Sequence, residues 1–172
     1  RFNPVIENEI IINKAVIIDG QGHTISAEGM GRIFNITSDN VTLKNITLIQ
    51  GSVVYDNGGA VYNTGDNILI SDCTFKENQV YYYGTTIAEG RGGAICSYGN
   101  LTVTNSVFED NWVSGVDYAA GRGGAIYSNA AVNISFSCSS IFFSSSSILV
   151  ESLAEYSSSS LALASIPKFS IS

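Results

Sequence analysis

The chain repeats one short stretch three times: Gly58-Gly59-Ala60-Val61-Tyr62, then Gly92-Gly93-Ala94-Ile95-Cys96, then Gly123-Gly124-Ala125-Ile126-Tyr127. A second motif accompanies it, because Phe75-Lys76-Glu77-Asn78 returns as Phe108-Glu109-Asp110-Asn111. Short motifs that recur at a period of a few tens of residues are typical of repeat architectures, in which each repeat is one supersecondary unit.

Short apolar/polar alternations separate these motifs. They cover residues 41–44, 68–71, 101–104 and 132–135, and the turn formers Asn45, Asp72 and Asn105 each precede a further short alternation. None of these segments has the ten or more residues at a 3.6-residue period that a helix requires. The pattern predicts an all-β fold, a single-stranded right-handed parallel β-helix over residues 1–135 with one coil per about 27–34 residues.

Stacked coils place equivalent side chains above one another, about 4.8 Å apart. We therefore expect four inward ladders: Val41, Ile68, Leu101 and Val132; Leu43, Ile70, Val103 and Ile134; Leu48, Phe75 and Phe108; Val61, Ile95 and Ile126. The paired glycines suit a sharp corner, and Asn78 above Asn111 predicts a ladder of side-chain amides.

Composition narrows the function. Charged residues make up 13% of the 172 residues and the formal net charge is −7, which argues against a nucleic-acid-binding protein. There is one histidine, His23, and the three cysteines, Cys73, Cys96 and Cys138, lack metal-site spacing, so we expect no metal site and no cofactor. No apolar run is long enough to span a membrane. Because the chain begins with Arg1, we expect the natural N-terminus, any export signal and any anchor to lie outside this sequence.

The composition changes near residue 136. All 17 glycines precede that point, whereas the segment 136–172 is rich in serine. We expect a low-complexity tail that is weakly structured, arising from a change of reading frame, a truncation or a genuine serine-rich stalk.

Two longer excursions, 79–91 and 112–122, leave the coil at the same edge. They carry the candidate ligand-binding residues, which are Tyr81, Tyr82, Tyr83, Trp112 and Tyr118, with Arg91 and Arg122 as candidates for binding an anionic sugar. Flat aromatic rings stack on sugars and anchor protein interfaces, but they also serve as loop packing, and the arginines also suit local pairing.

The pairing of GGAI-type and FxxN motifs over residues 15–135 resembles the polymorphic outer-membrane protein repeat and adhesin-like surface proteins. Residues 16–25 are similar to the first coil of pectin-lyase-like chains. The resemblance implies a right-handed β-helix of an extracellular, cell-surface or outer-membrane protein, with a role in adhesion.

The interpretation is a fragment of a non-catalytic adhesin-like protein or structural stalk. Its expected partners are glycans or proteins of host or neighbouring cell surfaces, without nucleic acid, with membrane attachment through a missing anchor and with end-to-end self-association. The alternative is a carbohydrate-active enzyme fragment of the pectate lyase or polygalacturonase kind. Its carboxylates would have to converge on one face, whereas Asp19, Asp39, Asp56, Asp66 and Asp72 lie scattered at expected turns, so no catalytic residue is assigned.

Overall fold

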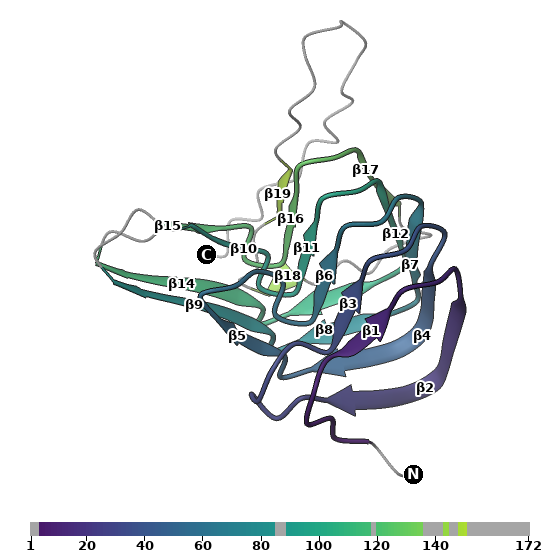
Figure 1. The fold of residues 1–172 in the computed structure, drawn as a ribbon, viewed down its shortest axis with the longest axis horizontal. Helices are drawn as coiled ribbons and strands as arrows, with labels where there is room; N and C mark the ends of the chain where they lie inside the picture. Colours follow the sequence, from purple (N-terminus) through teal and green to yellow (C-terminus); the bar gives the residue numbers. More distant parts are fainter. Residues whose placement is uncertain (1–3, 85–88, 118–119, 136–142, 145–147, 151–172) are drawn as a thin grey trace, which may run out of the picture.

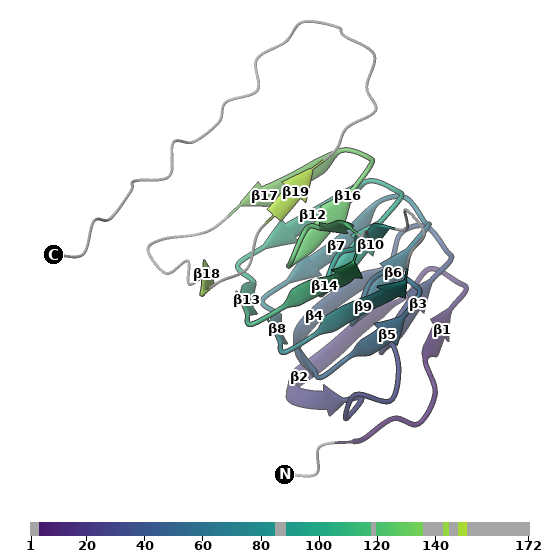
Figure 2. The same cartoon turned by 90° about the vertical axis from the view of Figure 1, so that its left-hand side faces the viewer.

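The fold is taken from a computed structural model that describes residues 4–84, 89–117, 120–135, 143–144 and 148–150. It is a parallel β-solenoid of about four turns, and the described residues contain no helix (Figure 1). Every strand pair between successive turns is parallel, and Figure 2 shows these turns stacked side-on. The predicted all-β parallel solenoid is confirmed, while its right-handed winding stays a prediction.

One face of the solenoid is a six-stranded sheet that carries the GGAI-type motifs. Its order is β1 (Ile10–Ile12), β3 (Phe34–Ile36), β6 (Val61–Asn63), β11 (Ile95–Ser97), β16 (Ile126–Ser128) and β19 (Ile148–Val150). Val61 pairs with Ile95 and Ile95 with Ile126, as the motif alignment predicts.

The other two faces form one bent sheet. Its strands are β17 (Val132–Ser135), β12 (Leu101–Thr104), β7 (Ile68–Ser71), β4 (Thr42–Ile49), β8 (Thr74–Lys76), β13 (Val107–Glu109) and β18 (Phe143–Ser144), and β2 (Ile17–Ser26) pairs with β4. The sheet bends because β4 pairs with β7 through its first half and with β8 through its second half. The bend follows the predicted turn formers Asn45, Asp72 and Asn105, which have φ of 51°, 53° and 47°. Asn and Asp tolerate this left-handed conformation better than most residues.

The four predicted ladders form the core, except that Val132 and Ile134 of the last turn are only partly buried and pack against it. Leu43, Ile70 and Val103 are each 0% exposed and lie in register, and Phe75 stacks on Phe108 with ring centroids 4.8 Å apart and planes 2° apart. Burial of such side chains stabilises a protein by roughly 1.5–3 kcal/mol each, so the ladders stabilise the stacking of the turns.

The serine-rich segment contributes two short strands to the stack. Aligning Val132 with Leu101 places Ser139 opposite Phe108, whereas the structure pairs Phe143 with Phe108 in β18. It also pairs Ile148 with Ile126 in β19. The apolar residues of this segment therefore continue the register after a longer connection than the alignment allows.

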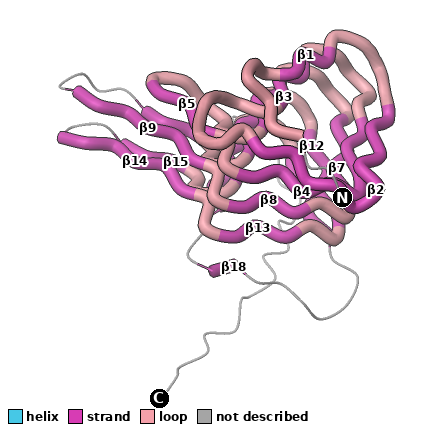
Figure 3. The backbone as a smooth tube through the Cα atoms, turned by 90° about the horizontal axis from the view of Figure 1, so that it is seen from below, coloured by secondary structure: helices cyan, strands magenta, loops and turns pink. Residues whose placement is uncertain are grey.

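The two predicted excursions form a projecting wing of paired strands (Figures 1 and 3). Its outer sheet consists of β5 (Ser52–Val54), β9 (Gln79–Gly84) and β14 (Trp112–Asp117), and its inner sheet of β10 (Glu89–Arg91) and β15 (Ala120–Arg122). Each excursion runs outward along the outer sheet and returns along the inner one, so the stacking of the coil extends into the wing.

Candidate functional site

The wing starts at a corner that buried asparagines hold in place. Asn78 is 0% exposed and donates through Nδ2 to the carbonyl of Leu48 at 3.1 Å and to Oδ1 of Asn111 at 2.9 Å, while its own Oδ1 accepts from the N–H of Gly51 at 2.8 Å. Asn111, 1% exposed, repeats the arrangement by donating to the carbonyl of Phe75 at 2.9 Å. The predicted asparagine ladder is confirmed, and it satisfies backbone groups that the turn would otherwise leave unpaired.

The chain returns from the wing at the paired glycines. Gly58, Gly92 and Gly123 have φ of 69°, 65° and 64°, which favours glycine. A Cβ on Gly93 would overlap the carbonyl oxygen of Gly124 in the next turn. The first glycine of each pair is therefore required by a left-handed backbone, and the second by the close approach of the backbone in the next turn.

The outer face of the wing gathers exposed aromatic side chains. Tyr81 and Tyr83 alternate along β9 on this face, with centroids 5.7 Å apart and planes 13° apart, and Trp112 of β14 meets Tyr81 edge-on at 4.7 Å. Trp112 is 38% and Tyr83 is 47% exposed. Burial nevertheless raises the pKa of the Tyr81 hydroxyl, which donates to Oε1 of Gln79 at 3.1 Å.

The inner side of the wing is packed. A Cβ on Gly90 of β10 would come within 2.7 Å of Val113, 2.8 Å of Tyr82 and 3.1 Å of Val80, so the two sheets touch through these side chains. Burial raises the pKa of Tyr82. Tyr82 therefore lies against the inner sheet, and its ring also meets the exposed Tyr55 edge-on, with centroids 5.8 Å apart.

The candidate Arg91 is the last residue of β10 in the inner sheet of the wing. Its Nη1 donates to the hydroxyl of Tyr98 at 2.9 Å, and its guanidinium lies 5.0 Å from the ring centroid of Tyr127. Arg122 stands in register with Arg91 on β15. Earlier in the chain, Arg32 repeats the cation–π contact at 5.0 Å over Tyr62. The contacts of Arg91 join the wing to the GGAI-bearing sheet, and Arg32 makes the corresponding contact outside the wing.

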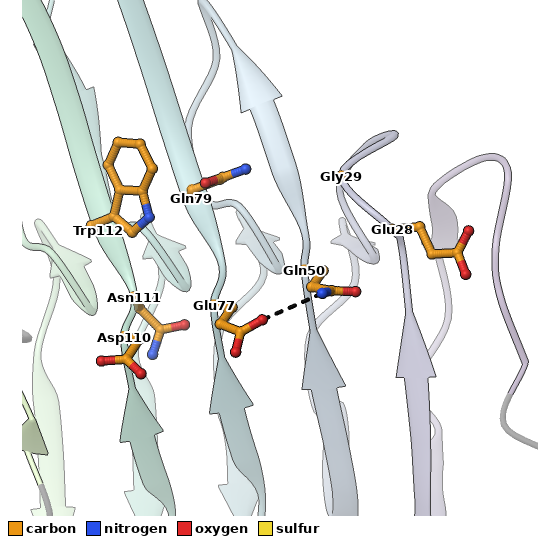
Figure 4. A pocket seen from close by; sticks show the side chains of 8 residues that line it. All are labelled: Glu28, Gly29, Gln50, Glu77, Gln79, Asp110, Asn111 and Trp112. Carbon is orange, nitrogen blue, oxygen red and sulfur yellow. Dashed lines mark hydrogen bonds between the residues drawn. The ribbon is translucent and has the colours of Figure 1, made fainter.

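An open groove of about 1010 Å³ runs along the stacked turns where the wing leaves the coil (Figure 4). Its lining includes Glu28, Gln50, Glu77, Gln79, Asp110 and Trp112. The Nε2 of Gln50 donates to Oε2 of Glu77 at 3.3 Å. The groove therefore has an acidic and amide wall on the coil and Trp112 at the base of the wing.

The structure brings together part of the predicted set. Tyr81, Tyr83 and Trp112 share the outer face, Tyr82 and Arg91 lie on inner surfaces, and Tyr118 lies outside the described residues. Sequence reasoning missed Val54, Tyr55 and the polar residues of the groove, although it included Trp112. A signal for the first two was present, since Ser52-Val53-Val54 aligns with Gln79-Val80-Tyr81 as a shorter copy of the excursion.

The described residues hold no group of three or more His, Cys, Asp or Glu side chains that could bind a metal ion, and none of their elements is a helix that could cross a membrane. Cys73 and Cys96 are buried free thiols, and burial raises their pKa values to about 11 and about 12. The low thiolate content of such groups at neutral pH does not favour nucleophilic chemistry.

Comparison with known proteins agrees with this geometry. Residues 72–98 and 105–129 match the repeat of the Chlamydia polymorphic membrane proteins. Each match begins at a turn former, includes an FxxN motif and an excursion, and extends past a GGAI-type motif. Comparisons with curated proteins and with solved structures gave no significant match.

The repeat is associated with outer-membrane and surface proteins that are generally non-catalytic. Both matched segments coincide with the turns that carry the wing. Two consecutive segments of the chain therefore match the polymorphic membrane protein repeat, and each of them corresponds to one winged turn of a parallel β-solenoid.

Proposed function

We propose that this protein is a non-catalytic, surface-displayed solenoid that binds carbohydrate through the outer face of its wing. The observation that carries the proposal is the gathering of exposed aromatic rings on a rigid paired-strand platform. Four of the nine exposed large apolar residues among those described lie on or beside this wing: Val54, Tyr55, Tyr83 and Trp112. Exposed apolar groups that gather in one place mark binding surfaces, whereas scattered ones need no explanation.

The platform suits sugars because its rings are held in place by their neighbours. Trp112 is fixed against Tyr81, and Tyr55 packs edge-on against Tyr83 with centroids 6.3 Å apart. Preorganised rings lose little conformational entropy when a ligand stacks on them. The family association with the cell surface supports display outside the cell, where glycans are available partners.

A glycan array probed with the 172-residue chain tests the proposal. We expect discrete glycan hits that Trp112→Ala and Tyr83→Ala each weaken about tenfold, since stacked aromatic rings contribute on the order of 1–2 kcal/mol. Ile17→Ala is the control, because Ile17 is 68% exposed and lies in the first turn, away from the wing.

A blank array, with no glycan bound by the protein or by Trp112→Ala, would refute glycan binding and favour a structural spacer. Release of unsaturated product from polygalacturonate in the presence of calcium would instead support the enzyme alternative and overturn the non-catalytic proposal.

A further inference from the structure

The outer sheet of the wing ends at β14, which has a neighbour on one side. The order of this sheet is β14, β9, β5, and within the described part of the chain no strand pairs with the other side of β14. The opposite edge strand, β5, is three residues long, whereas β14 spans six, from Trp112 to Asp117. A very short edge strand gives another chain little to pair with, but a longer one without proline or lysine is a template for strand addition.

The next turn of the same chain is too short to place a strand beside β14. The connections that build the wing are residues 77–94 and 110–125, whereas the equivalent connection from β18 to β19 is residues 145–147. A segment of that length spans at most about 11 Å, too little to run out along β14 and return. The next turn therefore continues the coil without continuing the wing, and it leaves the edge of β14 open.

The register with β9 shows which backbone groups lie on the open side of β14. The N–H of Trp112 donates to the carbonyl of Asn78 at 3.0 Å, so Trp112 faces β9. Successive residues of a strand direct their N–H and C=O groups to alternate sides. Val113, Gly115 and Asp117 therefore direct these groups away from β9, toward the open side.

This set of backbone groups is symmetric about Gly115. Hydrogen-bonded residues of an antiparallel pair stand directly opposite each other. A second β14, related by a twofold axis through Gly115, would place Gly115 opposite its own copy and Val113 opposite Asp117 of the second copy. All three residues of each strand then exchange hydrogen bonds, so the edge is complementary to itself, as an isologous interface requires.

The coil determines the orientation in which a second copy fits. The wing projects past the coil (Figures 1 and 3). A second copy added in parallel would need the space beside β12, β13 and β16 that β17, β18 and β19 already occupy. An antiparallel copy points its wing in the opposite direction, so its coil lies beyond the tip of the first wing.

We propose that two copies of this protein form a dimer by antiparallel pairing of their β14 strands, with Gly115 on the twofold axis. The pairing continues a sheet that already exists, and a second wing is an ordered sheet that loses less conformational entropy than an extended peptide would. Because the axis is perpendicular to the sheet, both outer aromatic faces lie on the same side of the dimer. The interface is independent of what those faces bind.

Sedimentation equilibrium of the 172-residue chain at a series of micromolar concentrations tests the proposal. We expect an equilibrium between monomer and dimer without larger species, because a twofold interface is closed. Gly115→Pro should weaken the dimer at least about tenfold, since each proline removes one N–H at the axis and two hydrogen bonds are lost per dimer. The substitution keeps the hydrogen bonds to β9, because position 115 faces away from that strand.

Val54→Pro is the matched control at the opposite edge of the same sheet. The N–H of Tyr55 donates to the carbonyl of Tyr81 at 2.9 Å, so the alternation directs the N–H of Val54 away from β9. The control therefore introduces the same residue at the same kind of position, and it should leave the dimer unchanged. The fluorescence of Trp112, the single tryptophan, reports whether the wing stays folded in both variants.

A second pair of variants tests the register without proline. In a chain with Cys73, Cys96 and Cys138 replaced by alanine, Gly115→Cys should form a disulfide between copies, because the Cα atoms of a hydrogen-bonded antiparallel pair are about 5.5 Å apart. Ser114→Cys is the control, since the offset from the axis places its two Cα atoms about 8 Å apart, beyond the reach of a disulfide.

A chain that stays monomeric at every concentration would overturn the proposal, and so would growth into species larger than a dimer, which end-to-end stacking of coils produces. Equal weakening of the dimer by Gly115→Pro and Val54→Pro would overturn it as well. Linkage of Ser114→Cys as readily as Gly115→Cys would show that Gly115 is not on the axis. A blank glycan array with an intact dimer would refute only the proposed function.

Discussion

Replacing Asn78 by alanine should destabilise the protein strongly, because this side chain ties three consecutive turns together. The substitution leaves the N–H of Gly51 without its acceptor at a site that is 0% exposed, and it removes the hydrogen bonds to Leu48 and Asn111. A buried unpaired donor costs about 1–3 kcal/mol, and two further lost hydrogen bonds cost about 0.5–1.5 kcal/mol each. The expected loss is therefore about 2–6 kcal/mol, a large share of the 5–15 kcal/mol typical of a domain.

Urea unfolding, followed by far-ultraviolet circular dichroism and by the fluorescence of Trp112, measures this loss. Trp112 is the single tryptophan and lies directly after Asn111, so it reports on the same corner. Asn100→Ala is the matched control at an exposed position and should change the free energy of unfolding by less than about 0.5 kcal/mol. If Asn78→Ala were as mild as Asn100→Ala, the asparagine ladder would not stabilise the stack and the reasoning would be wrong.

Three further predictions concern backbone packing and the buried thiols. Gly93→Ala should destabilise the protein by several kcal/mol and lower its thermal midpoint, because the new Cβ would overlap Gly124. Gly31→Ala is the control and should be nearly neutral, because open space surrounds Gly31. Similar midpoints for the two variants would contradict the close approach of the backbone at Gly93. Cys73 and Cys96, with pKa values of about 11 and about 12, should resist iodoacetamide at pH 8 in the native protein and react in urea; rapid native labelling of either would be incompatible with its burial. The pKa values of these thiols in the folded protein exceed the value of 9.0 expected when it is unfolded. Their contribution to the free energy of unfolding is therefore fully present below pH 9 and is lost as pH rises toward 11–12, which urea unfolding at a series of pH values should show.

The core was predictable from sequence because the solenoid repeats its environment. Ile70 and Val103 have the same neighbours one turn apart, so motif alignment alone places them in register. The glycine corner and the asparagine ladder followed for the same reason, since each needs one residue type at one position. The alignment did not pair Phe143 with Phe108 because the connection before Phe143 differs in length from those in the other turns.

The wing was predictable as an excursion but not as paired strands. Its register places Gln79 beside Trp112 and Tyr82 beside Gly115, pairs that share neither size nor polarity. Tyr81 and Tyr82 lie on opposite faces because side chains alternate along a strand. Three consecutive tyrosines show no apolar/polar alternation, so the sequence gives no sign of this arrangement. The groove was not predicted because Glu77 and Asp110 occupy a variable position of the FxxN motif. Their exposure at the corner follows from their left-handed backbone conformation, which the motif does not reveal.

Engineered disulfides test the stacking of turns most directly. In a background with Cys73, Cys96 and Cys138 replaced by alanine, Leu69→Cys combined with Thr102→Cys joins outward positions of adjacent turns that lie in register. Neighbouring strands are about 4.8 Å apart, within the Cα separation that a disulfide spans, whereas positions two turns apart lie about 9.6 Å apart, beyond its reach.

The account predicts that oxidation links residues 69 and 102 quantitatively, as read by peptide mapping under non-reducing conditions. The pair Leu69→Cys and Asn133→Cys, which lies two turns apart, should stay reduced. Failure of the first pair to close, or closure of the second as readily as the first, would contradict the stacked parallel solenoid on which the wing and its groove depend.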